Sequence, residues 1–253
     1  MTLHHRELAW DGVLNARDLG GHSTADGGET RYGRIVRADS IRQLTDAGWR
    51  AFLDYGIRTV VDLRGDHEMD EDPPAEVPVE VLHAPFMEAN EREWEEILTE
   101  VEAARESAPD VETTTRDVYL IFLEHFKENV GAGIRAVARA PEGGVVVHCA
   151  GGKDRTGLLT AFLLHLAGVD DEQIAADYAL SEERLRPRQE EWLAKAETEA
   201  ERERLREISR TPAASMLGVF EELERRYGSV EQFLREAGVS DEDLAKARAR
   251  LRD

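Results

Sequence analysis

The chain of 253 residues contains one cysteine, within the segment VVHCAGGKDRTG at 146–157. An arginine stands six positions after it, and the loop between them contains two glycines, a lysine and an aspartate. A cysteine thiolate is a strong nucleophile, and a guanidinium binds two oxygens of a phosphoryl group at once. These residue types at this spacing predict that Cys149 attacks a phosphate held by Arg155.

The elements expected around the cysteine place it where an anion would bind. GGVVVHC at 143–149 indicates a buried strand, and TGLLTAFLLHLAG at 156–168 is apolar nearly all round, which predicts a buried helix. The thiol therefore lies near a helix N-terminus, where backbone N–H groups are unpaired and the helix dipole is positive. The glycines allow the loop to turn its N–H groups inward as an anion nest, and Lys153 and Arg155 add positive charge. This setting is expected to favour the reactive thiolate of Cys149.

The neighbours of the cysteine and the arginine suggest supporting roles. His148 is expected to orient the loop and help hold the thiolate, and Thr156 is expected to donate its hydroxyl to the departing sulfur. Asp154 is a candidate general acid for the leaving oxygen and then a base for water. The alternative for Asp154 is a loop carboxylate paired with a cation, because neighbouring positive charges make a carboxyl more acidic. The residues expected to bind phosphate are Ala150, Gly151, Gly152, Lys153, Asp154 and Arg155.

The spacing of Cys149 and Arg155 alone is weak support, because arginine is abundant in this chain. The alternative is an inert core cysteine, which is the commonest fate of a lone thiol. The strand before it, the glycines, the hydroxyl after the arginine and the apolar helix together favour the reactive interpretation, since a charged glycine-rich loop is a poor place for an inert thiol.

Short β-branched runs alternate with helical patterns through the first part of the chain. This alternation indicates an α/β fold with a central, mostly parallel sheet flanked by helices. Strands are expected at 33–38, 58–63, 79–84 and 143–149. Helices are expected between and after them at 44–56, 116–126, 133–140 and 156–168.

The C-terminal part of the chain is expected to be helical throughout. The segment 186–208 is very polar with a thin apolar stripe, so it buries little and is expected to be mobile. The breaks DEDPPAEVP at 70–78 and ESAPDVETTT at 106–115 predict surface loops. The acidic segment between them predicts a solvated helix. The predicted helix starts are Thr45, Asp170, Ser229 and Ser240 as N-caps and Pro212 as a first helical residue.

Composition excludes several classes of function. The net charge of −21 repels nucleic acid and anionic lipid, so an anionic substrate requires a local positive site. No apolar run approaches the roughly 20 residues of a membrane span, so no stable membrane insertion is expected. Neither an apolar leader nor a second cysteine occurs, which indicates a cytoplasmic protein and leaves leaderless secretion open. The histidines lack metal-ligand spacing, so no metal is expected.

The segment HCAGGKDRTG resembles the phosphate loop, C-x5-R, of the cysteine-dependent protein tyrosine phosphatases. More narrowly, it is similar to the bacterial group with the pattern H-C-x-x-G-K-D-R-T-G. The resemblance covers nearly the whole chain, although the phosphate loop is its most specific part. The other matching segments are NARDLGG (15–21), RADS (37–40), VVDLR (60–64), ADYALS (176–181) and YGSVEQFLREAGVS (227–240).

The resemblance implies a cysteine-phosphatase-like fold and hydrolysis of phosphate monoesters through a phosphocysteine on Cys149, without cofactor or metal. Members of this group accept phosphotyrosine and sometimes phosphoserine, phosphothreonine or phosphoinositides. Protein phosphotyrosine is therefore the expected substrate, and a dual-specificity or phosphoinositide phosphatase is the alternative. A phosphate or sulfate ion is expected to occupy the loop. An inactive phosphate-binding module and a sulfurtransferase are the alternatives from other classes, but the intact Cys149, Arg155 and Thr156 argue against the first.

The resemblance also assigns roles outside the loop. The polar helices fall where a member of the group has a helical lid, so 186–210 is expected to be a lid within one phosphatase domain at 1–253. Glu88, in APFMEAN, stands where that member has a second candidate acid; the alternative is a solvent-facing loop carboxylate. Asn15, in NARDLGG, is expected to buttress the phosphate loop or to belong to a turn with a local ion pair.

Overall fold

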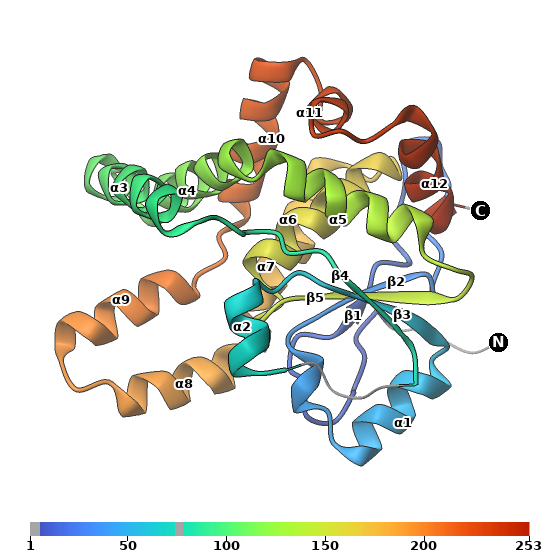
Figure 1. Cartoon of the computed structure of the whole chain (residues 1–253), viewed down its shortest axis with the longest axis horizontal. Helices are drawn as coiled ribbons and strands as arrows, with labels where there is room; N and C mark the ends of the chain where they lie inside the picture. Colours follow the sequence, from blue (N-terminus) through green and yellow to red (C-terminus); the bar gives the residue numbers. More distant parts are fainter. Residues whose placement is uncertain (1–5, 74–77, 253) are drawn as a thin grey trace.

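The computed structural model describes residues 6–73 and 78–252 (Figure 1). At the centre, these residues form a five-stranded sheet with the order β1-β2-β5-β3-β4. β2, β5, β3 and β4 pair in parallel, and β1 joins β2 antiparallel, which confirms the predicted α/β class. The two-residue β1 is too short to give a detectable sequence period. The strands are Arg17–Asp18 (β1), Ile35–Ala38 (β2), Ile57–Asp62 (β3), Glu80–His83 (β4) and Gly144–His148 (β5).

Helices surround the sheet and form the whole C-terminal part of the described chain (Figure 1). They are α1 (Asp46–Asp54), α2 (Asp66–Glu71), α3 (Glu91–Ser107), α4 (Val111–His125), α5 (Lys127–Arg139), α6 (Asp154–Leu166), α7 (Asp171–Arg184), α8 (Arg186–Lys195), α9 (Glu199–Ser209), α10 (Ala213–Tyr227), α11 (Val230–Glu236) and α12 (Asp241–Arg252).

The predicted helix starts are mostly confirmed by side-chain caps. The hydroxyl of Thr45 accepts the N–H of Gly48, and the predicted caps of α7, α11 and α12 accept backbone N–H groups in the same way. Pro212 is the N-cap of α10 and not its first helical residue. The proline supplies the fixed backbone angle that leads into the helix.

The prediction of a surface loop at 106–115 is wrong. Helix α3 continues to Ser107, and α4 begins at Val111, so the break is only three residues long. Asp110 accepts the N–H of Thr113 at 2.8 Å and starts the next helix directly after Pro109 ends the previous turn. Of the other predicted loop, at 70–78, the first two residues belong to α2, and 74–77 lie outside the described residues.

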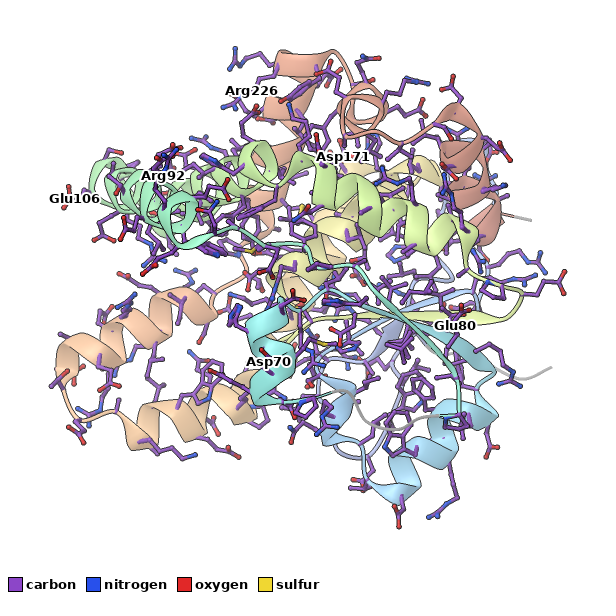
Figure 2. The ribbon with its side chains drawn as sticks, in the orientation of Figure 1. Asp70, Glu80, Arg92, Glu106, Asp171 and Arg226 are labelled. Atoms are coloured by element: carbon purple, nitrogen blue, oxygen red, sulfur yellow. The ribbon has the colours of Figure 1, made fainter. Side chains whose placement is uncertain are left out.

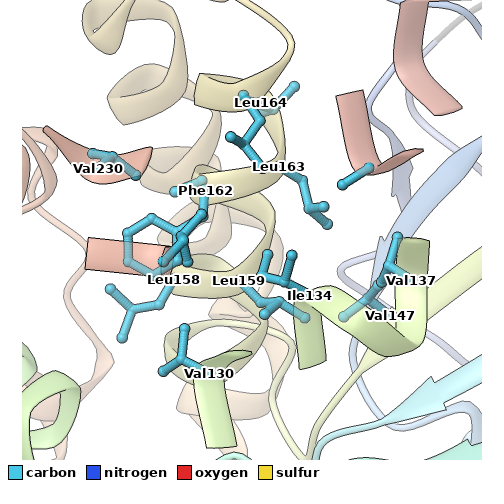
Figure 3. Packing of buried hydrophobic residues seen from close by; sticks show 14 of the residues in the cluster. Val130, Ile134, Val137, Val147, Leu158, Leu159, Phe162, Leu163, Leu164 and Val230 are labelled. Carbon is cyan, nitrogen blue, oxygen red and sulfur yellow. The ribbon is translucent and has the colours of Figure 1, made fainter. Parts of the chain in front are cut away.

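The valines of β5 divide between the two faces of the sheet. Val145 and Val147 pack with α5 and α6, whereas Val146 packs with Phe52 of α1 on the opposite face. Figure 2 shows the charged side chains of Arg92 and Glu106 on α3, away from the sheet. Figure 3 shows Val147 beside Val137 of α5 and the leucines of α6. The strand is therefore covered on both faces, as its continuous apolar run predicts.

The helices α8 and α9 form a hairpin that projects from the body of the molecule (Figure 1). Neither helix contains a fully buried residue, and Trp192 and Ile208 are among its exposed large side chains. The hairpin thus buries little of its own surface, as the thin apolar stripe of this segment predicts. Every helix within the described residues is too short or too polar to span a bilayer.

Candidate active site

The cysteine lies between the centre of the sheet and the first turn of α6. β5 ends at His148, Cys149 is buried, and α6 begins at Asp154, so Arg155 already belongs to the helix. Gly152 has a φ of +62°, and a Cβ there would lie 2.3 Å from the carbonyl oxygen of Ala38. Only glycine fits this position, because a side chain would be strained and would collide with backbone.

The carbonyl groups of the loop all point to hydrogen-bond donors outside it. The oxygen of Ala150 accepts the N–H of Ser40 at 3.0 Å, and the side chain of Asn15 donates to the oxygens of Gly151 and Gly152 at 3.2 and 3.0 Å. In the described chain, the N–H groups of residues 150–155 have no protein acceptor. A loop with its carbonyls bound outward and its N–H groups unpaired is suited to binding an anion. The expected buttressing by Asn15 is observed in these bonds.

A buried ionic cluster supports the same loop. Arg37 donates to the oxygen of Gly152 at 2.9 Å and to the carboxylate of Asp177, on α7, at 2.9 Å. Arg17 and Arg6 bind that carboxylate as well, and the side chains of Arg17, Arg37 and Asp177 are each 1% exposed. Burial raises the pKa of Asp177, but the charges of Arg17 and Arg37 outweigh it and hold the pKa well below its ordinary value. The cluster therefore holds Arg37 against the loop.

Arg155 is paired with a carboxylate from α2. Its Nη2 donates to Oε1 of Glu68 at 2.9 Å, and its Nη1 donates to Oε2. Burial lowers the pKa of Arg155, but Cys149 and Glu68 raise it more, so the guanidinium remains charged. The loop arginine is thus held between α6 and the segment that follows β3.

Lys153 and Asp154 face α4 and the end of the helical hairpin. Oδ1 of Asp154 accepts the hydroxyl of Tyr119 at 2.5 Å and lies 3.2 Å from Nζ of Lys153. The hydroxyl of Tyr119 is in turn 2.8 Å from that of Tyr178. Lys153 also donates to the carbonyl oxygen of Ile208, at the end of α9. Oδ2 of Asp154 has no hydrogen-bond partner among the described residues.

His148 and Thr156 lie on the buried side of the cysteine. Nδ1 of His148 is 3.2 Å from the carbonyl oxygen of Cys149, and its Nε2 is 3.5 Å from Asp62. Burial lowers the pKa of His148 more than Asp62 raises it. A neutral imidazole has only one N–H group. We assign it to Nδ1, because the contact with the carbonyl oxygen of Cys149 is shorter than the contact between Nε2 and Asp62. The hydroxyl of Thr156 is buried and finds no partner within residues 6–73 and 78–252.

Glu88 lies at the N-terminus of α2. Its Oε2 accepts the N–H of Asp66 at 2.9 Å, and in the described chain it forms no bond to residues 149–155. The structure therefore brings His148, Thr156 and residues 149–155 together. Glu88 instead contacts α2, whose Glu68 binds Arg155. No group of three or more His, Cys, Asp or Glu within the described residues is arranged to hold a metal ion.

Two cavities flank the phosphate loop. One, of about 410 Å³, lies between α2 and α8 and reaches Ala150, Arg64 and Arg188. The other, of about 450 Å³, lies between α4 and the end of α9 and reaches Lys153 and Asp154. Arg188 of α8 donates to the carbonyl oxygen of Ala150 at 3.5 Å and to Asp39 at 2.7 Å. Because Lys153 donates to Ile208 of α9, the hairpin contacts the loop at both Ala150 and Lys153.

Sequence reasoning missed Glu68, Tyr119 and the role of the buried arginine cluster. Charged residues are usually exposed, so a pattern gives no sign that Arg37 and Asp177 are buried partners. Asp62 and Arg64 belong to the matching segment VVDLR, and the structure pairs them at 2.7 Å where β3 ends. Glu68 lies four residues after this segment, on α2.

Comparison with known proteins agrees with this geometry. The chain is 28% identical over 277 residues to the triple specificity protein phosphatase PtpB of Mycobacterium tuberculosis, which covers 97% of this chain and 98% of that protein. It is 26% identical over 226 residues to a tyrosine-protein phosphatase of Nostoc commune, in an alignment that covers 86% of this chain and 74% of that protein. The sequence model of the tyrosine phosphatase family matches residues 8–253. With nearly its whole length matched, the chain belongs to the tyrosine phosphatase family.

Proposed function

We propose that this phosphatase hydrolyses protein phosphotyrosine through a phosphocysteine intermediate on Cys149. The observation that supports it most strongly is the set of unpaired N–H groups at residues 150–155, which lie beside the thiol and the guanidinium of Arg155. These donors match the three equatorial oxygens of a phosphoryl group and the charge that develops on them. The name of the Mycobacterium tuberculosis relative, a triple specificity protein phosphatase, supports dual specificity as the second candidate.

In the first step, the sulfur of Cys149 attacks phosphorus in line with the ester bond. The S–P bond forms, the P–O bond to the substrate breaks, and Asp154 delivers a proton to the leaving oxygen. In the second step, Asp154 takes a proton from water as the water oxygen bonds to phosphorus, and the S–P bond breaks. The buried hydroxyl of Thr156 is free to donate to the departing sulfur.

Asp154 is a better candidate for this acid than Glu88. Oδ1 of Asp154 is fixed by Tyr119, which leaves Oδ2 for the proton. Glu88 instead uses its carboxylate to accept a backbone N–H of α2. Phosphoinositides remain a further alternative substrate because Lys153 adds positive charge to the loop, although its Nζ is bound to the carbonyl of Ile208.

We further propose that 1–253 acts as one phosphatase domain and that 186–210 serves as its lid. The hairpin α8–α9 lies in this range and contacts the loop through Arg188 and Ile208. A reducing compartment, such as the cytoplasm, suits a nucleophilic cysteine that is the chain's only one.

The deciding experiment is hydrolysis of p-nitrophenyl phosphate in EDTA, repeated with Cys149→Ser. Wild-type turnover and its loss in the variant are expected; turnover that persists in Cys149→Ser, or that requires a divalent metal, would refute the mechanism. For the acid, Asp154→Asn is compared with Glu88→Gln on aryl phosphates of different leaving-group pKa. A loss of about 10²–10⁴-fold that grows with poorer leaving groups is expected for Asp154→Asn alone. Phosphotyrosine, phosphoserine and phosphoinositide substrates then rank the specificity.

A further inference from the structure

We infer that the cavity between α2 and α8 binds a basic side chain of the substrate, so that this phosphatase prefers phosphotyrosine near an arginine or lysine in a peptide. The cavity has a volume of about 410 Å³ and reaches Ala150 of the phosphate loop. This inference rests on the proposed function, because it takes phosphotyrosine to be held at that loop.

Two regular helix faces line this cavity. Residues three and four positions apart lie on the same face of a helix. The lining residues from α8 follow this spacing; they are Arg188, Glu191 and Trp192. The lining residues from α2 and its C-cap repeat it; they are Glu68, Glu71 and Asp72. The two faces therefore border one space, and Figure 1 shows the two helices next to each other.

Both cations that line the cavity, among the described residues, are already neutralised by carboxylates. Arg188 binds Asp39 at 2.7 Å, and Arg64 binds Asp62 at 2.7 Å. The side chains of Asp39 and Asp62 are almost completely buried, so these pairs are well shielded from water. The two guanidiniums therefore contribute little net positive charge to the cavity.

Two carboxylates at the cavity have no such partner. The carboxylates of Glu68 and Asp72 are bound to arginines, whereas Glu71 and Glu191 form no ion pair or hydrogen bond with the part of the chain that the structure describes. Because Glu71 and Glu191 come from different helices, a cation in the cavity can lie between them. The net charge of −21 acts in the same direction. The cavity therefore favours a cation and disfavours a second anion.

Trp192 and Ser40 add contacts that suit a guanidinium or an ammonium group. Trp192 is 43% exposed, so part of its ring is open to a ligand, and an indole face attracts cations. Ser40 is only 8% exposed, and its hydroxyl finds no partner within residues 6–73 and 78–252. Buried hydroxyls normally have a partner, which an N–H group bound in the cavity would supply. Both observations are independent of the two free carboxylates.

The cavity and the phosphate loop share a wall, which limits where the basic residue stands in the peptide. The carbonyl oxygen of Ala150 accepts the N–H of Ser40 at 3.0 Å and an N–H of Arg188 at 3.5 Å. An extended peptide advances about 3.3–3.6 Å per residue, so a residue three positions away lies at most about 11 Å along the chain. We therefore place the basic residue within three positions of phosphotyrosine.

The test is an arginine scan of a phosphotyrosine peptide with the full-length protein. Arginine or glutamine is placed at each of the three positions on either side of phosphotyrosine, and phosphate release gives kcat/KM for every peptide. The measured quantity is the ratio of kcat/KM for the arginine peptide to that for the glutamine peptide. At one or more positions we expect a ratio of about 5–10, mainly through KM, at about 0.15 M salt. The ratio should fall towards one at about 1 M salt.

Two double variants test whether the cavity causes this preference. Glu71→Gln/Glu191→Gln removes both free carboxylates and is expected to lower the ratio below about 2. The matched control is Asp70→Asn/Glu190→Gln, which removes one charge from each of the same helices at exposed residues that do not line the cavity. Figure 2 labels Asp70. The control should keep the wild-type ratio, because it changes the net charge equally but leaves the cavity intact.

The possible outcomes separate this inference from the proposed function. A ratio that survives in Glu71→Gln/Glu191→Gln would overturn the inference, and so would a ratio that falls equally in the control, since a general effect of net charge would then explain it. If the wild type hydrolyses the glutamine peptides but no arginine position gives a ratio above about 2, only this inference fails. If the wild type hydrolyses neither the peptides nor p-nitrophenyl phosphate, the proposed function fails with it.

Discussion

Replacement of Asp177 by asparagine tests how much of the active-site frame depends on one buried charge. Asparagine keeps the size and one acceptor oxygen of aspartate but removes its negative charge. Arg17 and Arg37 would then face each other inside the protein without a counter-ion. Burial, with the charge of Arg37 as the second cause, already lowers the pKa of Arg17 to about 9 in the wild-type protein.

The magnitude follows from the burial of the three side chains. Each is 1% exposed, and removal of one partner from a buried ion pair costs about 3–5 kcal/mol, because the remaining charge is left uncompensated. The contact with Arg6 is 28% exposed on the arginine side and adds little. For a chain of this size, that loss corresponds to a melting temperature lower by about 6–20 °C.

The assay is equilibrium urea unfolding at pH 7, followed by thermal unfolding of the same proteins. The matched control is Glu96→Gln, which removes a carboxylate from an exposed pair with Arg92 on α3 and is expected to cost at most about 0.5 kcal/mol. A loss under about 1 kcal/mol for Asp177→Asn, with an unchanged denaturant slope, would refute the claim that this carboxylate neutralises the buried arginines.

Two further predictions concern the loop and the behaviour in acid. Gly152→Ala is expected to lower kcat/KM at least about 100-fold, because its Cβ would collide with Ala38. In the control Gly151→Ala the new Cβ meets only the Cβ of Lys153, at 4.0 Å, so kcat/KM should fall far less. Equal losses in the two variants would contradict the steric argument. Burial, helped by the charge of Arg6, lowers the pKa of His22 to about 4 in the folded protein. Between pH 6.5 and 4, His22 therefore binds a proton in the unfolded chain but not in the folded one. The free energy of unfolding should fall by about 3 kcal/mol as the pH drops through this range. Urea unfolding at pH 7 and pH 4.5 should show a smaller acid loss in His22→Gln, and an identical loss would exclude His22 as its source.

The strand, loop and helix around Cys149 were predictable because they are contiguous in sequence. Apolar runs, glycines and charges follow one another there, and each has a local structural meaning. Of the residues that support the loop, Asn15 was expected only through the family resemblance. The buried pair of Arg37 and Asp177 was not predictable, because these residues come from distant segments and their contacts depend on how β2, α7 and the loop meet in three dimensions.

The errors at 106–115 and at Pro212 have a common cause. Proline, serine and aspartate indicate that a helix stops or starts, but not how many residues separate one helix from the next. Asp110 is the N-cap of α4, so the segment 106–115, whose composition is typical of a loop, contains the end of α3 and the start of α4 with only three residues between them. The partner of Arg155 was missed for another reason, since a glutamate on a short polar helix looks the same in sequence whether it binds solvent or a guanidinium.

The position of β5 in the sheet has a consequence for how the chain is made. Its neighbours β2 and β3 do not pair with each other, and both precede it by a long stretch of sequence. At about 5–20 residues per second, a ribosome completes β3 roughly 5–15 s before β5 emerges. During that interval two apolar strand edges have no partner, which favours association with other chains or with chaperones. Cys149, the proposed nucleophile, directly follows the strand that closes the sheet, so the proposed mechanism requires the sheet to be complete before a nascent chain becomes active.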